Sequence, residues 1–471
     1  MGEDETMNVQ VISGPAKDSA GSRTNRSPAQ NGIERPNGKF QALTARNLDS
    51  ITEFGNVTGD DLFAMRVVSS VLPFRTNRYV IEHLIDWERV PDDPIYQLVF
   101  PQKGMLADRD FRRVADLMVR EAPRPEIDRA IFDIRAGLNP HPAGQREFNI
   151  PSEDDEVFEG LQHKYRETVL FFPSQGQTCH AYCTFCFRWA QFVGDKELKI
   201  SSKDAEGLHR YIAAHPQVSD LLMTGGDPMI MKTRVMEGYL RPFVDDPALG
   251  HVQNIRIGTK ALTFWPHRFV HDEDADDMLR LLEAIVRSGR HVAIMAHFNH
   301  WQELRTNVVR EAVRRIRDTG AVIRGQAPLL AHINNDPDIW ARLWREQVRL
   351  GIIPYYMFVE RDTGAKQYFE VPLERCWEVF RGAVEQVSGL ARTVRGPSMS
   401  ATPGKVEVLG VQEVGGEKVF VLRFLQGRDP DWVGRPFFAK YDPQATWLDG
   451  LEPAFGENAF FFEEGLRAMT G

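Results

Sequence analysis

Six strand-length apolar runs alternate with amphipathic segments between residues 167 and 360, and this alternation limits the folds open to the chain. The segments Asp272–Ser288 and Thr306–Thr319 carry apolar residues at helical spacing, and each is followed by a glycine that stops a helix. Six β-then-α units in series predict a parallel sheet with right-handed crossovers. Because a closed barrel of this type has eight units, we expect an α/β fold, a partial (βα)6 barrel of TIM-like design. The six runs are Thr168–Phe172, Asp220–Thr224, Asn254–Gly258, His291–Met295, Ala321–Gln326 and Pro354–Phe358.

Two regions precede the barrel, which we assign to residues 161–390. Residues 1–40 are rich in Ser, Asn, Gly, Pro and charge, so they cannot bury enough apolar surface to fold and are expected to be a disordered tail. Residues 41–160 have an irregular, mostly helical pattern. The segment Asp110–Glu121 places its apolar residues on one face, which favours a helix packed on a core.

A C-terminal extension, residues 391–471, follows the barrel. It begins with a Gly/Pro/Ser-rich loop from Arg395 to Gly404, directly before Lys405. The runs Val406–Gly410 and Val419–Phe424 predict strands, with Gly415-Gly416 in the turn between them. Such an extension could close over the mouth of the barrel.

Charge and composition exclude several classes of protein. The net charge is −9 at pH 7 and no Lys/Arg-rich run occurs, so we expect no nucleic-acid partner. No apolar run approaches about 20 residues, so we expect no membrane span, and the polar, acidic start does not resemble a secretory signal. Four cysteines without a pairing pattern indicate a reducing compartment, and we expect a cytoplasmic protein.

Three of the four cysteines, Cys179, Cys183 and Cys186, lie on one stretch after the first apolar run. Thiolates spaced four and then three residues apart can converge on a single centre. Iron–sulfur clusters are held by cysteine thiolates, usually four of them, so here one iron of a cubane cluster would stay open to another ligand. Two alternatives are three ligands of a zinc site and inert buried thiols.

Other polar and glycine motifs follow the ends of the predicted strands. Because parallel α/β folds place ligands at the carboxyl ends of their strands, these motifs are expected at one mouth. Two of them have a structural alternative: Gly-Gly-Asp occurs in ordinary turns, and the histidines could be satisfied structural side chains or hydrogen-bonding groups at the barrel mouth. The motifs are Thr224-Gly-Gly-Asp-Pro228, His297 with Asn299 and His300, Gln326, Tyr355 with Tyr356, and Glu360-Arg-Asp362.

The pattern CxxxCxxC, with Phe185 before its last cysteine, resembles the signature of radical S-adenosylmethionine enzymes. A narrower resemblance, to the lysine 2,3-aminomutase family, covers about residues 160–410. It rests on motifs in the family's order: the cysteine loop, Thr224-Gly-Gly-Asp-Pro228, Asn254-Ile-Arg-Ile-Gly258, His297-Phe-Asn-His300, Gln326 followed by Leu329, Leu330 and Asn334, and Pro354-Tyr-Tyr356.

The resemblance implies the radical S-adenosylmethionine fold and an isomerase that moves the α-amino group of an amino acid to its β-carbon. It implies three cofactors: a [4Fe-4S] cluster held by the three cysteines, S-adenosylmethionine and pyridoxal 5′-phosphate. The residues it implies around the cluster and S-adenosylmethionine are Phe185, Gly225, Gly226, Asp227, His297 and Gln326.

The pyridoxal cofactor needs a lysine, and the resemblance points to Lys405, although its loop departs from the family's run of glycines. A surface lysine that starts a strand is the alternative. Arg188 matches the family arginine that binds the substrate carboxylate, a task that suits a planar guanidinium. The stretch His163-Lys-Tyr-Arg166 resembles the family's segment near the cofactor phosphate, which implies that Lys164 and Tyr165 contact the cofactor. Phosphate binding by Lys164 and Arg166 has a solvated surface pair as its alternative.

Two positions set this chain apart from lysine-specific enzymes, which hold the distant ammonium group with two aspartates. In this chain, Arg361 occupies the position of the first aspartate, with Asp362 one residue later. Ser398 occupies the position of the second aspartate. Because an arginine repels an ammonium ion, we expect an acidic or neutral amino acid as substrate, glutamate first. A shift of one residue would bring Asp362 into the pocket instead.

Other assignments remain open. A radical enzyme on this scaffold could act without amino migration, as an epimerase, a dehydrogenase or a modifier of a protein-bound lysine, and a non-catalytic iron–sulfur or zinc protein is a third alternative. The enzyme would take electrons from a one-electron reductant of the flavodoxin or ferredoxin type. A homo-oligomer is compatible with the resemblance, although no cysteine follows Cys376 to form the family's C-terminal zinc site.

Overall fold

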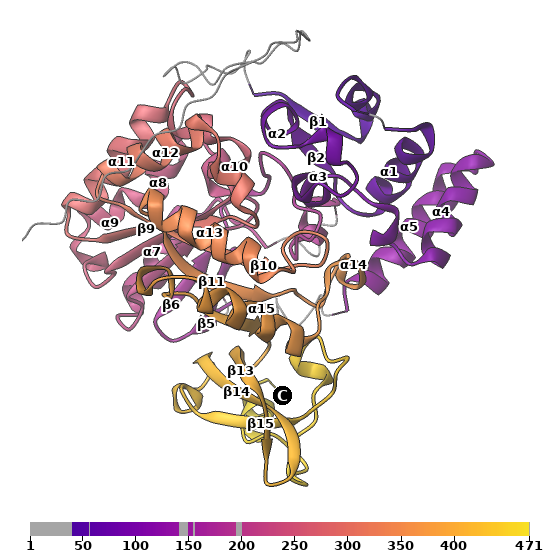
Figure 1. Ribbon diagram of the computed structural model, residues 1–471. Helices are drawn as coiled ribbons and strands as arrows, with labels where there is room; N and C mark the ends of the chain where they lie inside the picture. Colours follow the sequence, from indigo (N-terminus) through magenta and orange to yellow (C-terminus); the bar gives the residue numbers. More distant parts are fainter. Residues whose placement is uncertain (1–39, 56, 141–148, 154–155, 195–199, 471) are drawn as a thin grey trace, which may run out of the picture. The chain divides into compact units, whose positions relative to one another are not determined.

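The computed structural model describes residues 40–470, except for 56, 141–148, 154–155 and 195–199. The predicted tail lies outside these ranges apart from its last residue. One sheet of 11 strands has the order β15-β14-β13-β12-β11-β10-β9-β8-β7-β6-β5 (Figure 1). Its central strands confirm the six predicted runs and pair in parallel: β6 (Thr168–Phe171), β7 (Asp220–Met223), β8 (Asn254–Thr259), β9 (His291–His297), β10 (Val322–Leu329) and β11 (Ile353–Val359).

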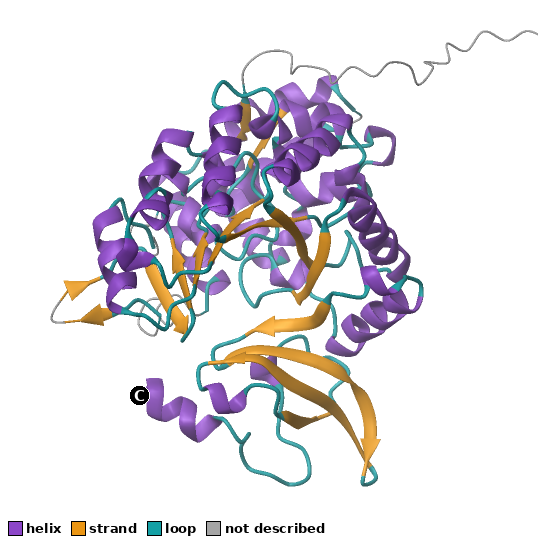
Figure 2. Ribbon diagram, turned by 90° about the vertical axis from the view of Figure 1, so that its left-hand side faces the viewer, coloured by secondary structure: helices purple, strands orange, loops and turns teal. Residues whose placement is uncertain are grey.

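Helices link these strands and pack on their outer side, as Figure 2 shows. The two helices expected from periodicity are present, and each is followed by a glycine with positive φ (89° at Gly289 and 86° at Gly320). Each of these two helices buries its apolar stripe against the sheet, on the strand that comes after it in the chain. The main barrel helices are α7 (Ala205–Ala214), α8 (Thr233–Leu240), α11 (Ala275–Arg287), α12 (Asn307–Asp318), α13 (Pro337–Leu350) and α15 (Leu373–Glu385).

A seventh parallel strand, β12 (Arg395–Ser400), occupies part of the segment that composition predicted to be a loop, so that prediction is wrong. The strand pairs in parallel with β11 and antiparallel with β13. At Gly396, an added Cβ would lie 2.2 Å from the carbonyl oxygen of Met357. The glycine therefore permits a close approach between strands, which composition alone does not distinguish from a flexible loop.

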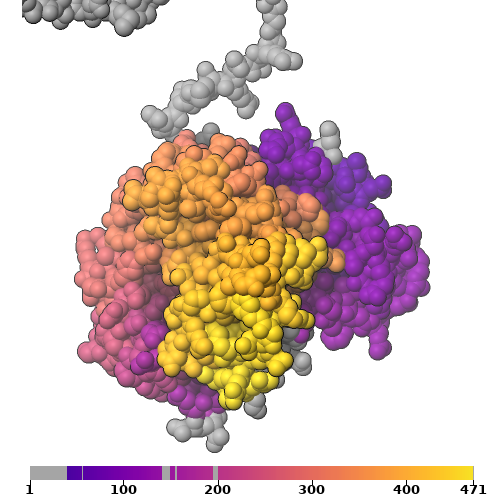
Figure 3. All heavy atoms as spheres, turned by 60° about the horizontal axis from the view of Figure 1, so that its bottom comes forward, coloured from indigo at the N-terminus to yellow at the C-terminus, as the bar shows by residue number. Residues whose placement is uncertain are grey.

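The C-terminal extension continues the same sheet with antiparallel strands β13 (Gly404–Val414), β14 (Glu417–Gly427) and β15 (Pro436–Lys440). These strands are longer than the predicted runs, and the turn falls at Gly415-Gly416 as expected, with φ values of 61° and 84°. A short 3-10 helix, η12 (Leu448–Gly450), and helix α16 (Glu463–Thr470) follow. Figure 3 shows the extension in yellow beside the orange residues of the last barrel units.

The N-terminal region is mostly helical, and its hydrophobic core includes residues of the cysteine loop, among them Ala181, Phe185 and Trp189. The boundaries predicted near residues 160 and 390 stay predictions, because all described residues belong to one compact unit. No helix in the described part of the chain has the length and apolar character needed to cross a membrane. The elements are β1 (Ala42–Thr44), α1 (Gly59–Val71), β2 (Arg75–Asn77), α2 (Arg78–His83), α3 (Pro94–Val99), α4 (Asp108–Val119) and α5 (Arg124–Leu138).

Candidate active site

A cavity of about 520 Å³ gathers many of the residues singled out in the sequence. Its wall comes from the hairpin β5 (Leu161–Tyr165) and β6, the cysteine loop, the loop after β11, the start of β13 and the C-terminal extension. Among its lining residues are Lys164, Tyr165, Arg188, Arg361, Asp362 and Lys405. Ser398 is not in this wall: its side chain is fully buried on β12, where the hydroxyl donates to the Met357 carbonyl at 3.5 Å.

Lys405 presents its amine to this cavity over the faces of two aromatic rings. Its Nζ lies 4.1 Å from the ring centroid of Tyr356 and 5.6 Å from that of Phe358. Burial lowers the pKa of Lys405 to about 7, and the charges of Arg256 and Arg395 act in the same direction. A buried amine of this pKa is neutral in a large fraction of molecules near pH 7, as a nucleophilic lysine requires.

Lys164 has a different environment from Lys405. Its Nζ donates to the carbonyl oxygen of Ala401 at 2.5 Å, which ties the β5 strand to the loop before Lys405. Burial lowers the pKa of Lys164 well below its usual range, with further contributions from Arg428 and Arg361. Neighbouring Tyr165 also lines the cavity, and burial raises its pKa to about 12, so it stays a neutral hydroxyl.

The two predicted substrate arginines line the cavity, and both lie near the ring of Phe187. Arg188 lies 4.4 Å from the ring centroid of Phe172 and 5.1 Å from that of Phe187, and burial lowers its pKa to about 10, so it keeps its charge. Arg361 lies 5.2 Å from Phe187 and 5.8 Å from Trp447. Its buried Nε has no hydrogen-bond partner among the described residues, so a donor remains for a ligand.

The three cysteines of the loop are half-buried, and none of them forms a disulfide within the described residues. Burial raises the pKa of all three thiols, and the charges of Cys186 and Cys183 raise that of Cys179 further, so the thiols lie close enough to interact. Within the described ranges, no three His, Cys, Asp or Glu side chains are placed to hold a single metal ion. A four-iron cluster is wider than one ion, so its ligands stand farther apart.

Gly225 and Gly226 let the turn after β7 pack directly on the cysteine loop. An added Cβ at Gly226 would lie 2.6 Å from the backbone of Thr178, and one at Gly225 would lie 2.4 Å from Nε2 of Gln177. The Asp227 carboxylate is fully engaged within the protein: it accepts from Thr259 Oγ1 at 2.7 Å and from the backbone N–H of Lys260 at 2.9 Å. This motif therefore positions the cysteine loop through close backbone packing.

His297 and Gln326 are opposite each other on β9 and β10, and Nε2 of Gln326 lies 3.1 Å from Nε2 of His297. Burial lowers the pKa of His297 to about 3, with Lys260 and Arg188 adding to the effect. The imidazole is therefore neutral, and the Gln326 amide can donate to it. Phe185 is buried in the N-terminal core, with its ring edge-on to Phe369.

Several cavity residues were not among the predicted site residues, among them Arg256, Arg428, Trp447 and Asp449. Arg256 alternates with two isoleucines along β8. This pattern predicts that its side chain lies on the face of the strand opposite the isoleucines, so the sequence did contain a signal for it. The C-terminal residues carry no such local signal. Arg428 donates to the Thr402 carbonyl at 2.9 Å and to Asn149 Oδ1 at 2.7 Å, contacts that join distant parts of the chain.

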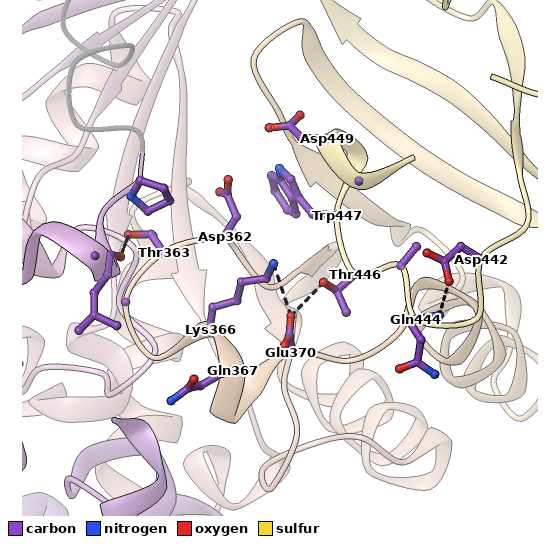
Figure 4. Close-up of a pocket in the computed structure, with 16 residues that line it drawn as sticks. Asp362, Thr363, Lys366, Gln367, Glu370, Asp442, Gln444, Thr446, Trp447 and Asp449 are labelled. Carbon is purple, nitrogen blue, oxygen red and sulfur yellow. Dashed lines mark hydrogen bonds and ion pairs between the residues drawn. The ribbon is translucent and has the colours of Figure 1, made fainter. Parts of the chain in front are cut away.

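A second cavity of about 560 Å³ adjoins the first (Figure 4). It lies between the end of α5, the loop after β11 and the C-terminal extension, and it shares Asp362, Trp447 and Asp449 with the first cavity. Glu370 connects the segment after β11 to the C-terminal extension, because its carboxylate accepts a hydrogen bond from the Thr446 hydroxyl at 2.9 Å. The same carboxylate forms an ion pair with Lys366 at 3.5 Å.

The fold and the three-cysteine loop define a chain of the radical S-adenosylmethionine class. The chain is 32% identical over 383 residues to a protein of Aquifex aeolicus named "Putative L-lysine 2,3-aminomutase", a match that covers 81% of this chain and 88% of that protein. It therefore belongs to the lysine 2,3-aminomutase family, a divergent member as the sequence predicted. It is also 25% identical to L-lysine 2,3-aminomutase of Bacillus subtilis, over 74% of this chain and 63% of that protein, and 26% identical to that of Escherichia coli, over 69% and 93%.

No family model matches the chain. A solved radical S-adenosylmethionine methyltransferase from Sphaerobacter thermophilus aligns with 62% of this chain and 95% of its own, at a TM-score of 0.36 and 12% identity.

Membership in the family implies the three expected cofactors, a [4Fe-4S] cluster, S-adenosylmethionine and pyridoxal 5′-phosphate, and an enzyme of the isomerase class. The residues present fit these groups. Three neighbouring thiols supply a cluster's donor set. A buried amine of lowered pKa suits the pyridoxal aldehyde, and the cationic wall around it suits a phosphate.

Proposed function

We propose that the chain is a radical S-adenosylmethionine, pyridoxal phosphate-dependent amino acid 2,3-aminomutase whose substrate is an acidic or neutral amino acid, glutamate first. The observation that carries this proposal is the buried amine of Lys405, with its pKa lowered to about 7, in the same cavity as Arg188 and Arg361. A solvated surface lysine would show neither the burial nor the aromatic faces around it.

Each residue has a task in this proposal. Cys179, Cys183 and Cys186 would hold the cluster, and Lys405 would hold the pyridoxal cofactor, with Lys164 and Arg428 near its phosphate. When bound, these cofactors supply hydrogen-atom abstraction and a carrier for the migrating nitrogen. The protein's own contribution is to orient the substrate in this cavity and to shield it from water.

Two arginines would orient the substrate. Arg188, which lies near the rings of Phe172 and Phe187, would bind the α-carboxylate through its planar guanidinium. Arg361 offers an unpartnered Nε–H to the side-chain carboxylate. The cavity wall carries four arginines against two aspartates, which supports an anionic ligand (Arg188, Arg256, Arg361 and Arg428 against Asp362 and Asp449).

Anaerobic reconstitution followed by mass spectrometry of the common amino acids for β-isomers tests the proposal. We expect β-glutamate from glutamate, and Arg361→Asp to lower kcat/KM for glutamate by roughly 30-fold or more, because a buried charge partner contributes about 2–5 kcal/mol. The exposed Arg345→Asp serves as the matched control. Conversion of lysine with glutamate ignored would overturn the substrate assignment.

The reaction type is tested separately from the substrate. Formation of 5′-deoxyadenosine without any β-amino acid would favour the alternative in which the scaffold acts without amino migration. Borohydride reduction followed by peptide mapping should place the pyridoxyl label on Lys405, and Lys405→Ala should lose the label while keeping the iron content. Dithionite can replace the flavodoxin- or ferredoxin-type reductant that we propose for the cytoplasm.

A further inference from the structure

The N-terminal region contacts the cysteine loop through its short strand β2. The backbone N–H of Tyr182 donates to the carbonyl oxygen of Arg75 at 2.8 Å. Nδ2 of Asn77 donates to the carbonyl oxygens of His180 at 3.1 Å and Phe264 at 2.9 Å. The strand is therefore a fixed neighbour of the three cysteines.

The side chain of Arg75 is directed toward the loop. Its Nη1 donates to Thr178 Oγ1 at 3.0 Å, and Thr178 immediately precedes Cys179. The Thr178 hydroxyl also lies 3.1 Å from the hydroxyl of Tyr182, and the guanidinium lies 5.6 Å from the ring centroid of Phe40. The buried Nε of Arg75 has no hydrogen-bond partner in the described part of the chain, so this donor is available to a group bound at the loop.

A cation in this position changes the electrostatic energy of a charged cluster held by the three thiolates. Three thiolates on a [4Fe-4S] core make an anionic group, and the addition of one electron makes it more negative by one charge. A nearby positive charge stabilises the reduced state more than the oxidised one, and does so strongly where water is excluded.

We propose that Arg75 is a positioning residue of the N-terminal region that raises the reduction potential of the cluster by placing a permanent positive charge beside the Cys179 end of the loop. Arginine suits this task because its charge does not titrate in proteins. The external one-electron reductant supplies the electron, and Arg75 makes its acceptance by the cluster more favourable. This proposal rests on the cluster and is independent of the substrate.

A reductive titration of the reconstituted protein with dithionite, monitored by the electron paramagnetic resonance signal of the reduced cluster, tests the proposal without any turnover. We expect Arg75→Gln to lower the reduced-to-oxidised ratio at a fixed potential about tenfold, which is ~59 mV for one electron. For Arg75→Lys we expect a ratio between that of Arg75→Gln and that of the parent protein. Thr178→Val, which keeps the charge but removes its anchor, should show a smaller shift in the same direction.

The control is Arg78→Gln, which removes an arginine three residues away that is half-exposed and paired with Glu82 at 3.2 Å. It should leave the potential unchanged. Equal potentials for Arg75→Gln and the parent protein would overturn the proposal. So would loss of most of the iron in Arg75→Gln with full loading in Arg75→Lys, because that result assigns Arg75 to folding of the loop.

Discussion

At the scale of single residues, the burial of Lys405 has a measurable chemical consequence. Because its pKa is lowered from about 10.5 to about 7, the neutral amine that reacts with an aldehyde becomes abundant as pH rises through 7. We expect the rate at which the apoprotein takes up pyridoxal phosphate to rise between pH 6 and 8 and then level off. Stopped-flow absorbance measures this rate. A rate that keeps rising to pH 10, as for free N-acetyl-lysine, would contradict the lowered pKa.

A second residue-scale prediction concerns Gly226. Alanine there would bring its Cβ to 2.6 Å from the Thr178 backbone, so the cysteine loop must shift. We expect Gly226→Ala to cost about 1–3 kcal/mol of folding free energy and to lower the iron bound per chain. Urea unfolding and iron analysis measure the two effects.

Gly238→Ala is the matched control for that substitution, because nothing lies within 4 Å of the added Cβ. It should leave iron loading unchanged and raise stability slightly, since the position is in helix α8. Full iron loading in Gly226→Ala would show that the close packing does not position the loop.

At the scale of elements, the C-terminal extension contributes to the cavity through Trp447, which is 5% exposed and lies beside Arg361. A cation over an aromatic face contributes about 0.5–2 kcal/mol. We therefore expect Trp447→Leu to raise KM for the side-chain carboxylate substrate about tenfold with little change in kcat, and Trp447→Phe to restore most of the affinity. Steady-state kinetics separates the two constants. An equal fall in kcat for both variants would instead indicate a general disturbance of the site.

The elements show where sequence patterns are informative. Short apolar runs correctly predicted β6 to β11, and period-3.6 apolar patterns correctly predicted the helices α11 and α12, because burial within one sheet and against it sets those patterns. Strand β12 was missed because its pairing depends on the approach of Gly396 to Met357, a contact between distant residues. The contributions of Arg428 and Trp447 to the site depend on the same kind of contact.

At the scale of the whole molecule, Asn77 joins the N-terminal core to the barrel. Its side chain is fully buried and donates to backbone carbonyls at His180 and Phe264. We expect Asn77→Ala to cost about 2–4 kcal/mol, because two buried carbonyls lose their donor, and to lower cluster loading. Urea unfolding and iron content check this, with exposed Asn307→Ala as the control. An unchanged unfolding free energy and iron content in Asn77→Ala would mean that apolar packing alone holds the N-terminal core against the barrel.

The sequence by itself determined the parallel α/β architecture and the three-cysteine loop, because local periodicity and short spacing encode both. It also named Arg188, Arg361 and Lys405, and the tertiary structure brings these three to one cavity. Only the tertiary structure decided that Ser398 lies away from that cavity, that Trp447 and Arg428 complete it, and that Arg75 reaches the cysteine loop. The physical reason is that these contacts join residues far apart in the chain, and no local pattern records which distant partner a side chain will meet.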